Sequence, residues 1–561
     1  MPVPEAQEAI DLGRRTVRRL RSELRRDDPT ARSTYLRAFH REFDRDPEPS
    51  SFDDLIIACF KADIVYVGDF HALPRSQEFA ARLLDEIARR SRRAVLAVEM
   101  VYGRHQAALD RWMAGRISEA EFLRRIRYEQ EWGYDWPAFR AVFDAARRHG
   151  IAVSGIDAAP RNGMRTIGKR DRHMAVRIAE IFESSPEAKV VALVGESHLA
   201  TSHLPSKVRE ELARRNLERR SVRVLQNLEE PYWRLVAKGG DLADTVTLGR
   251  NVYCAFNASP LEKYEAYRQT LERWNQERPD DHELDLTPSI YNMIDTILKF
   301  LGVDKYRRRV ERAGAGPAHL VDTYPEVYSS VDARRFRRVL LAQKVPRAGI
   351  DEILYHMRRN GSCYVPSVNA IYVGTFSLVH GGEEAAHFVH HALRGDLQAP
   401  VKEASRPDLF YEAVIEEAVG FFGSKLIDPS RNHFFETAFY RYYRRSPEEV
   451  EKETGHRYAE FRAIIDFILL HKKFERTYEQ YADVPEELIR GIRTRSRRMF
   501  SILTHELGYF LGQQIHDGFH SGAISREEVA ALFERRFTGR ADSFRIYLDL
   551  TERLPGGVTP S

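Results

Sequence analysis

Two histidines occur in the same short pattern at widely separated points of the chain. Each follows a run of apolar residues as Gly-x-x-His, at residues 68–71 (Gly-Asp-Phe-His) and 195–198 (Gly-Glu-Ser-His). Glu99 and Asp157 also stand directly after apolar runs. Histidines and carboxylates are costly to bury unless they pair with one another or bind something. Their repeated occurrence after apolar runs therefore indicates a functional site.

The side chains of His71, Glu99 and His198 supply two imidazoles and a carboxylate. Such a set can hold a divalent transition metal and leave open positions for water or substrate. The metal would lower the pKa of a bound water, with Glu196 or Asp69 as general base, and the reaction would be hydrolysis. Without a metal, the same groups could act as a paired acid and base or grip a cofactor. The catalytic candidates are His71, Glu99, Glu196 and His198.

These residues must be positioned by the elements that precede them. From about residue 51 to 256, short apolar runs alternate with helix-length amphipathic stretches, which predicts βαβ units and a mainly parallel sheet. The predicted strands cover 64–67, 94–98, 151–156, 190–194 and 222–225, and the predicted helices cover 76–90, 104–126, 137–149, 172–184 and 206–215. Ligands of open α/β sheets bind outside the carboxyl ends of the strands. The polar residues that follow the strands should therefore face one crevice.

The chain is too long for one domain. A length of 561 residues, with 43% hydrophobic residues, exceeds what one core usually organises. We expect an α/β domain with a mainly parallel sheet flanked by helices, and a second, mostly helical α+β domain. The expected parts are an N-terminal helical extension (1–50), the α/β domain (51–256), a helical connector (257–314) and the C-terminal domain (315–561). The last should contain a hairpin, with strands at 363–365 and 370–373.

Several short motifs of the α/β part resemble those of a known family. They are Glu99-Met100, the two Gly-x-x-His patterns, residues 131–136 (Glu-Trp-Gly-Tyr-Asp-Trp) and residues 157–161 (Asp-Ala-Ala-Pro-Arg). In this order they are similar to the ChaN-like haem-binding uptake family, whose superfamily also includes Tiki proteases and erythromycin esterases. The resemblance covers about residues 51–256. It implies an α/β domain whose site uses His71, His198 and Glu99, and which either binds haem or assists hydrolysis.

The resemblance also implies residues that would hold a cofactor. Tyr102, close after Glu99, is the candidate for a haem-ligating tyrosine. Arg161 could orient a carboxylate or a propionate, or form an ordinary salt bridge to Asp157. Asp69 stands where relatives commonly have glutamate, and its shorter side chain would weaken a general-base role. The cofactor-binding candidates are therefore Asp69, Tyr102, Asp157 and Arg161.

An aromatic cluster follows the second predicted strand. It comprises Trp132, Tyr134, Trp136 and Phe139. These rings could shield an apolar cofactor near the crevice, or they could simply pack between helix and sheet, as aromatic side chains do in most cores. The sequence leaves both interpretations open.

A second group of histidines lies in the C-terminal part. His387 and His391 would stand one turn apart on a helix, the geometry of two zinc ligands, and Glu416 on a later helix could be the third ligand. The surrounding pattern resembles a zincin, but Phe388 stands in the place of its catalytic glutamate. This part therefore predicts a metal site without peptidase activity, or no metal site.

A third histidine helix contains residues 505–512 (His-Glu-Leu-Gly-Tyr-Phe-Leu-Gly). It begins like the zincin signature but lacks the second histidine at the required spacing. Gly508 and Gly512, four residues apart, favour close packing of this helix against another. His505 could approach the helix of His387 and His391 in space.

Composition excludes some functions. The 87 basic and 83 acidic residues leave a net charge of +4, and short arginine runs lack interleaved aromatics, which argues against a dedicated nucleic-acid binder. Cys59, Cys254 and Cys363 are too few and too far apart for a disulfide framework or a short metal-binding pair. No apolar leader and no membrane-spanning run is evident, so we expect a cytoplasmic protein.

These observations lead to two principal functional hypotheses. The first is a ChaN-like protein that binds haem or a divalent metal ion in a crevice at the carboxyl ends of the strands. The alternative is a metal-dependent or Glu/His-assisted hydrolase of esterase or peptidase type. In both cases the partner is a small molecule, and neither requires nucleic acid or a membrane span. A degenerate scaffold is a third possibility.

Overall fold

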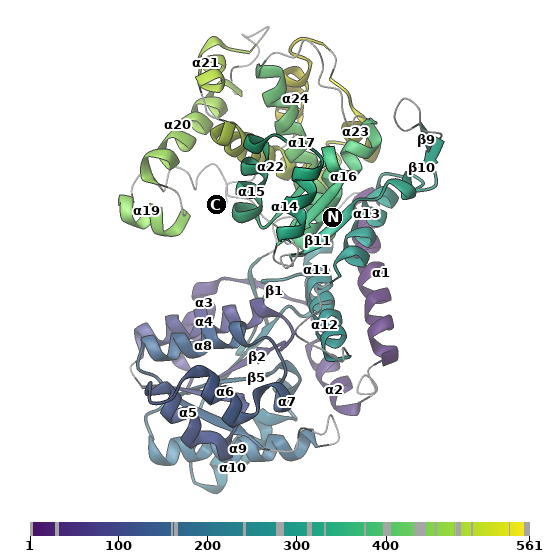
Figure 1. Ribbon diagram of the computed structural model, residues 1–561. Coiled ribbons are helices and arrows are strands. Elements are labelled where there is room, and N and C mark those ends of the chain that lie inside the picture. The colour runs from purple at the N-terminus through teal and green to yellow at the C-terminus, as the bar shows by residue number, and fades with distance from the viewer. Residues whose placement is uncertain are drawn as a thin grey trace. The chain divides into compact units, whose positions relative to one another are not determined.

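The chain forms two compact units in the computed structural model (Figure 1). The α/β unit contains residues 14–238 and 242–280, and the helical unit contains residues 1–13, 239–241 and 281–561. The structure describes residues 4–27, 33–91, 93–158, 161, 166–238, 243–275, 285–310, 317–329, 333–374, 377–395, 406–429, 431, 442, 445–454, 457–475, 477, 484–494, 497–537 and 539–554.

An eight-stranded sheet forms the centre of the α/β unit. Its order is β1-β7-β8-β6-β2-β5-β3-β4. The strands are β1 (Glu48–Ser50), β2 (Ile64–Asp69), β3 (Ala94–Tyr102), β4 (Ala152–Asp157), β5 (Lys189–Gly195), β6 (Ser221–Gln226), β7 (Thr245–Gly249) and β8 (Val252–Ala255). The six strands from β8 to β4 are parallel, whereas β7 pairs antiparallel with both β8 and β1. All five predicted strands are present, and the predicted α/β fold class is confirmed.

The central strands are apolar because they are buried on both faces. Every residue of β2 is buried, including the acidic residue Asp69 at its end. Short runs rich in valine, isoleucine and alanine are typical of parallel strands that are covered by helices on both sides. The burial of Asp69 therefore requires polar partners.

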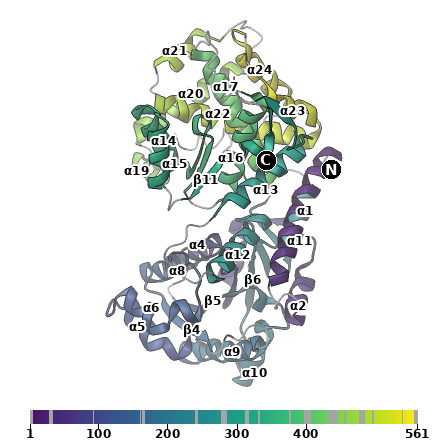
Figure 2. The ribbon, with the colours of Figure 1, turned by 45° about the vertical axis from the view of Figure 1, so that its right-hand side comes forward.

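Helices cover both faces of the sheet. In Figures 1 and 2, α4 (Pro74–Arg90) and α8 (Trp136–Arg148) lie together on one side, and α9 (Ile167–Ser184) and α10 (Leu204–Arg214) lie together on the other. The helix expected over 104–126 is two helices, α5 (Gln106–Met113) and α6 (Glu119–Ile126). Gly115 separates them with a φ of 69°, a left-handed conformation that glycine adopts without strain. The helices α3 (Phe52–Lys61) and α7 (Tyr128–Glu131) also belong to this part of the chain.

Elements from outside residues 51–256 complete the α/β unit. Strand β1 and the helix α2 (Thr34–Phe43) come from the first fifty residues, and α12 (Pro260–Asn275) follows the last strand. The helices α1 (Pro4–Asp27) and α11 (Glu229–Lys238) also contribute residues to this unit. The next helix, α13 (Thr287–Phe300), belongs to the helical unit. The stretch 257–314 is therefore divided between the two units.

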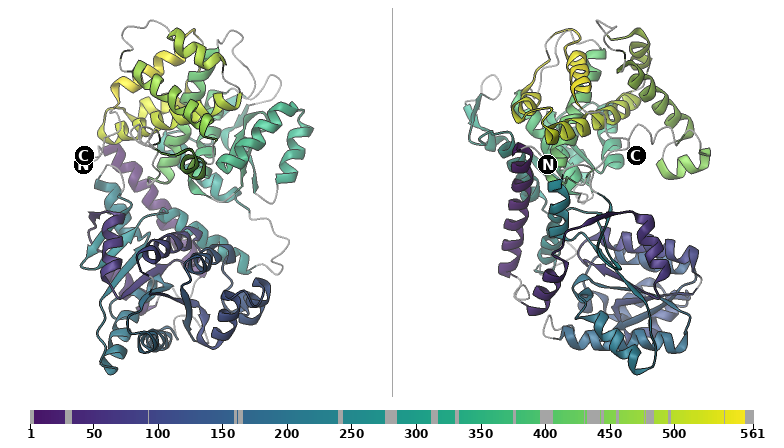
Figure 3. Two further views of the ribbon diagram at one scale, coloured as in Figure 1. Left: turned by 90° about the vertical axis from the view of Figure 1, so that its left-hand side faces the viewer. Right: turned by 180° about the vertical axis from the view of Figure 1, so that it is seen from behind.

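The described part of the helical unit consists mainly of helices, drawn green to yellow in Figure 3. At its centre, α17 (Arg406–Ile427) packs against α16 (Leu378–Arg394) and α22 (Arg497–Ser521). The predicted hairpin is present as β12 (Ser362–Val365) and β13 (Ala370–Val373), to which β11 (Glu326–Ser329) adds in parallel. The other elements are β9 (Arg308–Val310), β10 (Pro317–His319), α14 (Ala333–Ala342), α15 (Arg347–Asn360), α19 (Pro447–Thr454), α20 (Tyr458–Glu475), α21 (Glu486–Thr494), α23 (Arg526–Glu534) and α24 (Asp542–Arg553).

None of the described helices combines the length and the apolar content needed to cross a bilayer.

Glycine determines how closely α22 approaches α17. A Cβ atom on Gly508 would lie 2.3 Å from Glu417 Cβ and 2.8 Å from the Val414 carbonyl oxygen. A Cβ atom on Gly512 would lie 2.7 Å from the Ala418 carbonyl oxygen. These distances are shorter than any normal contact, and two of the three neighbouring atoms belong to the backbone. The predicted close packing of this helix is confirmed.

We expect Gly508→Ala to destabilise the helical unit by about 1–3 kcal/mol, because overpacking outweighs the roughly 1 kcal/mol gained in helix propensity. All five tryptophans lie in the α/β unit, so urea unfolding followed by both far-UV circular dichroism and tryptophan fluorescence separates the units. The unfolding transition of the helical unit, which is seen by circular dichroism but not by fluorescence, should have its midpoint at a lower urea concentration. Gly349→Ala is the control, since its Cβ would meet only Val345 Cγ1, at 3.4 Å. Equal effects of the two substitutions would contradict this prediction.

Candidate functional site

The two Gly-x-x-His patterns pack against each other at the ends of β2 and β5. A Cβ atom on Gly195 would lie 3.1 Å from His71 Nε2, and one on Gly68 would lie 3.3 Å from Glu196 Cα. Each glycine thus leaves room for residues of the other motif. The short 3-10 helix Glu196–Leu199, which follows β5, carries His198. Both motifs therefore begin with glycine because a side chain at that position would crowd the other motif.

Glu99, on β3, lies between the two histidines. Its Oε1 is 3.3 Å from His198 Nε2, and its Oε2 is 3.8 Å from His71 Nε2. The backbone N–H of Gly195 donates to Oε2 at 2.6 Å. Only 3% of Glu99 is exposed. Three segments far apart in the sequence therefore bring His71, Glu99 and His198 together.

A buried arginine from α9 neutralises the acidic groups. The guanidinium of Arg170 donates to the carboxylate of Glu99 and, at 2.9 Å, to Asp157 Oδ2. Arg161 Nε also donates to Asp157 Oδ2, at 2.8 Å. These ion pairs satisfy carboxylates that would otherwise be buried without partners.

This arrangement does not support the predicted metal at His71, Glu99 and His198. In the part of the chain that the structure describes, the group of His, Cys, Asp and Glu ligand atoms that lie within 4.8 Å of one another is elsewhere, at Glu383, Glu417 and His505. The guanidinium of Arg170 instead supplies a positive charge to Glu99. The geometry favours a network of ion pairs.

The charges of this network reinforce one another. Burial opposes protonation of His198, but the negative charge of Glu99 and the hydrogen bond to Asp171 raise its pKa to about 9. Burial alone would raise the pKa of Glu99, but the charges of His198 and Arg170 hold it well below its usual value. At neutral pH, Glu99 is therefore a carboxylate and His198 an imidazolium, and the two form a buried ion pair.

His71 has a different environment. Its Nδ1 lies 2.7 Å from Asp69 Oδ2, and Asp69 also accepts a hydrogen bond from the Gln77 side-chain amide. The ring packs against Trp132, with ring centres 4.4 Å apart, and against Tyr134, at 5.1 Å. A carboxylate on one imidazole nitrogen fixes the ring and makes the other nitrogen more basic.

The aromatic cluster is divided between the surroundings of His71 and the core. Trp132 and Tyr134 flank His71, whereas Trp136 packs in the core with Trp112 and Phe143, at ring centres 5.6 and 5.7 Å away. Phe139 is buried and lies 6.4 Å from the His71 ring centre.

A cavity of about 680 Å³ lies beside the ends of β2 and β5. Asp69, His71 and Glu196 are among its lining residues. Helices α1, α2, α11 and α12 supply most of the others. Glu196 is paired there with Lys263 of α12, whose Nζ lies 2.8 Å from Glu196 Oε1, and burial raises the pKa of the Glu196 carboxyl.

The other predicted residues are not among those that line this cavity. Tyr102 donates its hydroxyl to Glu131 Oε2 at 3.0 Å. The guanidinium of Arg161 lies over the rings of Tyr102 and Trp132, at 4.1 and 4.6 Å from their centres. Asp157 is fully buried in its ion pairs. Residues 159 and 160 of this motif lie outside the described residues.

Sequence reasoning missed three polar residues around His198. Besides Arg170, these are Asp171, whose Oδ1 lies 2.5 Å from His198 Nδ1, and Tyr35, whose hydroxyl donates to Asp171 Oδ2 at 2.7 Å. The ring of Tyr35 stacks on His203, with centres 3.5 Å apart. Tyr35 lies on α2, in the stretch that the sequence predicts to be an N-terminal helical extension. The residues next to Tyr35 in the sequence gave no indication that its side chain would reach His198.

The histidines of α16 contact different carboxylates. His387 Nδ1 is 3.2 Å from Glu384 Oε2, and His391 Nε2 is 2.7 Å from Glu416 Oε1. The structure therefore does not bring His387, His391 and Glu416 into one group of ligand atoms within 4.8 Å, in the part of the chain that it describes.

Comparison with known proteins bears on the α/β unit. The family model described as haem-binding uptake, Tiki superfamily, ChaN matches residues 55–170. The α/β unit contains a ChaN-like segment. This confirms the predicted resemblance. The ChaN-like segment includes His71, Glu99 and Asp157, whereas Glu196 and His198 follow it in the sequence.

Two solved structures are similar to part of the chain. One is ChaN of Campylobacter jejuni, described by its cofacial heme binding, with 14% identity and a TM-score of 0.25 over 36% of this chain and 91% of that one. The other is the type III effector HopBA1, with 17% identity and a TM-score of 0.26 over 38% of this chain and 95% of that one. No curated protein matches the chain.

Proposed function

We propose that the α/β unit binds haem, or a planar apolar ligand with similar anionic groups, in the cavity beside His71. The observation that carries this proposal is an imidazole that lines the cavity and is fixed by Asp69 through its Nδ1. His71 Nε2 would be the ligand to a haem iron. The family model matched by residues 55–170 is a haem-binding one, which supports the same ligand.

The lining of the cavity suits a large ligand that is apolar at its centre and anionic at its edge. A volume of about 680 Å³ is within the usual range for small-molecule sites. Tyr134, Phe70 and Tyr267 provide aromatic surface for the faces of a flat ligand. Arg37 and Arg41, both exposed on α2, could pair with carboxylates at its edge.

A haemin titration of the purified protein tests this proposal. A Soret band should develop on binding, and His71→Ala should abolish it or shift it strongly. Asp69→Asn should weaken binding about 10–100-fold, since it removes the partner that orients the ligand. His149→Ala, on a partly exposed imidazole paired with Asp85, is the matched control and should leave the band unchanged. A band insensitive to His71→Ala, or no band, would refute the assignment.

A second candidate function rests on the pair formed by Asp69 and His71. A carboxylate and an imidazole 2.7 Å apart, beside a cavity, form the usual geometry of a general base. Glu196, with its raised pKa, could donate a proton on the opposite side. A panel of ester and peptide substrates tests this hydrolase hypothesis. Activity that is lost in both His71→Ala and Glu196→Gln, without haemin binding, would favour hydrolysis over haem binding.

A further inference from the structure

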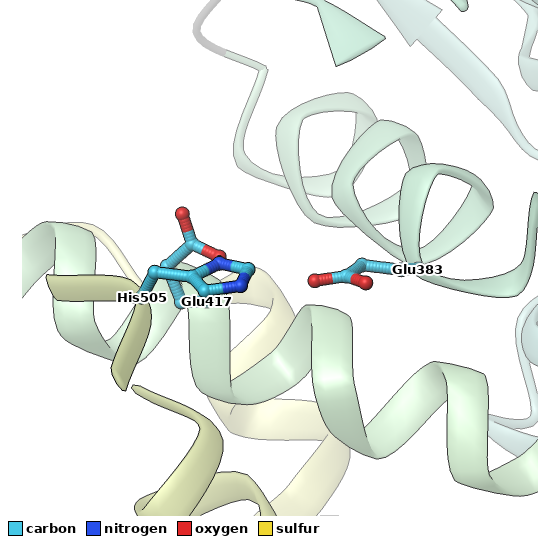
Figure 4. Close-up of side chains that lie close together, drawn as sticks. All are labelled: Glu383, Glu417 and His505. Atoms are coloured by element: carbon cyan, nitrogen blue, oxygen red, sulfur yellow. The ribbon is translucent and has the colours of Figure 1, made fainter. Parts of the chain in front are cut away.

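Three helices of the helical unit bring together a group of metal-ligating side chains. Glu383 lies on α16, Glu417 on α17 and His505 on α22, and one ligand atom of each lies within 4.8 Å of the other two. Figure 4 shows the imidazole of His505 between the two carboxylates. His505 Nδ1 lies 3.0 Å from Glu417 Oε2, and Glu383 is only 4% exposed. The group therefore differs from an exposed acidic cluster in both composition and burial.

A fourth side chain, His387, lies beside this group with a nitrogen that has no partner. Its Nε2 is buried and makes no hydrogen bond within the described residues, and it packs where a Cβ on Gly420 of α17 would stand, at 2.1 Å. Gly420 lies three residues after Glu417 on α17, so this imidazole faces the helix that carries Glu417. A buried imidazole nitrogen without a hydrogen bond is costly unless it binds something.

The orientation of His387 is fixed in the way that metal-binding histidines usually are. Its Nδ1 faces Glu384 Oε2 at 3.2 Å. Glu384 in turn accepts hydrogen bonds from Ser362 Oγ at 2.8 Å and from the backbone N–H of Tyr364 at 2.7 Å, both on β12. Metal-binding histidines usually bond a carboxylate through the ring nitrogen that faces away from the metal.

The charges of the immediate groups also fit a dication. Glu383, Glu384 and Glu417 contribute three carboxylates, and Arg431 compensates one of them through Nη2, 2.9 Å from Glu383 Oε2. With neutral imidazoles, two negative charges remain. A divalent cation would balance them.

We propose that Glu383, Glu417 and His505 bind a divalent first-row transition metal, such as Zn²⁺, Mn²⁺ or Fe²⁺, and that His387, which lies outside this group of ligand atoms, approaches as a fourth ligand when the metal is bound. Mixed imidazole and carboxylate ligands suit these ions, whereas Ca²⁺ and Mg²⁺ prefer oxygen ligands alone. The site lies in the unit that contains no residue of the ChaN-like segment, and it is independent of the proposed haem site. Gly508 is part of its construction, because the missing side chain lets α22 approach Glu417.

Titration of the chelator-treated full-length protein with Co²⁺ tests the site, since Co²⁺ bound by nitrogen and oxygen has visible absorption bands. The wild-type protein should show these bands, and Zn²⁺ should displace them. Glu417→Gln and His505→Ala should each weaken binding by at least about tenfold. Glu416→Gln is the matched control on the neighbouring residue of α17, and it should bind Co²⁺ normally. His71→Ala should also bind normally, which separates this site from the proposed haem site.

A second readout does not depend on the variants. In the wild-type protein, Zn²⁺ should raise the unfolding temperature of the helical unit, whose transition is seen by circular dichroism but not by tryptophan fluorescence. It should leave the unfolding temperature of the α/β unit, which tryptophan fluorescence reports, unchanged. Absence of Co²⁺ and Zn²⁺ binding by the wild-type protein would overturn the proposal. So would equal binding by the wild type, Glu417→Gln and His505→Ala, or a loss of binding in Glu416→Gln alone.

Discussion

Replacing Arg170 with methionine should destabilise the α/β unit by about 3–5 kcal/mol, the usual cost of breaking a buried ion pair. The side chain of Arg170 is only 11% exposed, and its guanidinium is shared between Glu99 and Asp157. Methionine has a similar length but no charge, so each of these buried carboxylates loses one cationic partner and keeps only His198 or Arg161. Part of the cost would appear as protonation of one carboxylate, which would make the variant more stable at lower pH relative to the wild type.

Tryptophan fluorescence during urea unfolding measures this effect, because every tryptophan of the chain lies in the α/β unit. Arg172→Met is the matched control, on an exposed residue of the same helix, and it should change the free energy of unfolding by less than about 0.5 kcal/mol. Arg170→Lys should lie between the two, since lysine restores the charge but not the paired hydrogen bonds. A cost below about 1 kcal/mol for Arg170→Met would show that the network is not buried as described.

The stability of the α/β unit should fall as the pH rises from 6.5 to about 9, through the pKa of His198 in the folded protein. The folded-state pKa is above the unfolded value, so the contribution is complete below pH 6.5 and is lost as the imidazolium deprotonates. A difference of this size is worth up to about 3 kcal/mol, at about 1.4 kcal/mol per pKa unit. For Glu99 the sign is opposite, because its folded-state pKa is depressed. Its contribution is present above its usual pKa and is lost as the pH falls.

The difference in unfolding free energy between the wild type and His198→Gln, measured by tryptophan fluorescence across this pH range, isolates the effect. The difference should shrink toward high pH, because the wild type loses the stabilisation by the His198 imidazolium, which the variant lacks at every pH. His149→Gln, on a partly exposed imidazole of the same unit, should show no comparable trend. A pH-independent difference for His198→Gln would mean that His198 is neutral in the folded protein.

Local pattern was enough to predict the central sheet and the meeting of His71, Glu99 and His198. The five predicted strands, among the six parallel ones, are short and apolar because both faces are buried, and this signal is independent of the rest of the chain. Parallel strands bring their carboxyl ends to one edge, so the residues that follow them could be expected to meet. The irregular register between Val98 and Tyr102 in the β3–β4 pairing could not be predicted from this pattern.

The elements around the cavity could not be predicted, because they are brought there only by tertiary packing. Tyr35 and Lys263 lie on amphipathic helices whose sequences fit a solvated surface equally well. Their partners, Asp171 and Glu196, are more than sixty positions away in the sequence. Spacing rules describe neighbours within one helix and say nothing about such contacts.

In the helical unit, the helix of His387 and His391 was predicted to meet the helix of Glu416, and the approach of the His505 helix was left open. The residues that face one another differ from those predicted. Successive residues of a helix point about 100° apart, so choosing Glu416 over Glu417 changes the face entirely. Both positions fit the same amphipathic pattern. Only the packing at Gly508, which places α22 against Glu417, determines which glutamate faces the group.

Strand β1 lies at the outer edge of the sheet, where it pairs only with β7. It has three residues, and the central one is Pro49, which has no N–H group to offer a further strand. Short, proline-bearing edge strands are a common protection against aggregation. A fragment lacking the first fifty residues would expose the backbone of β7 in its place, and copies of that fragment would be prone to join edge to edge.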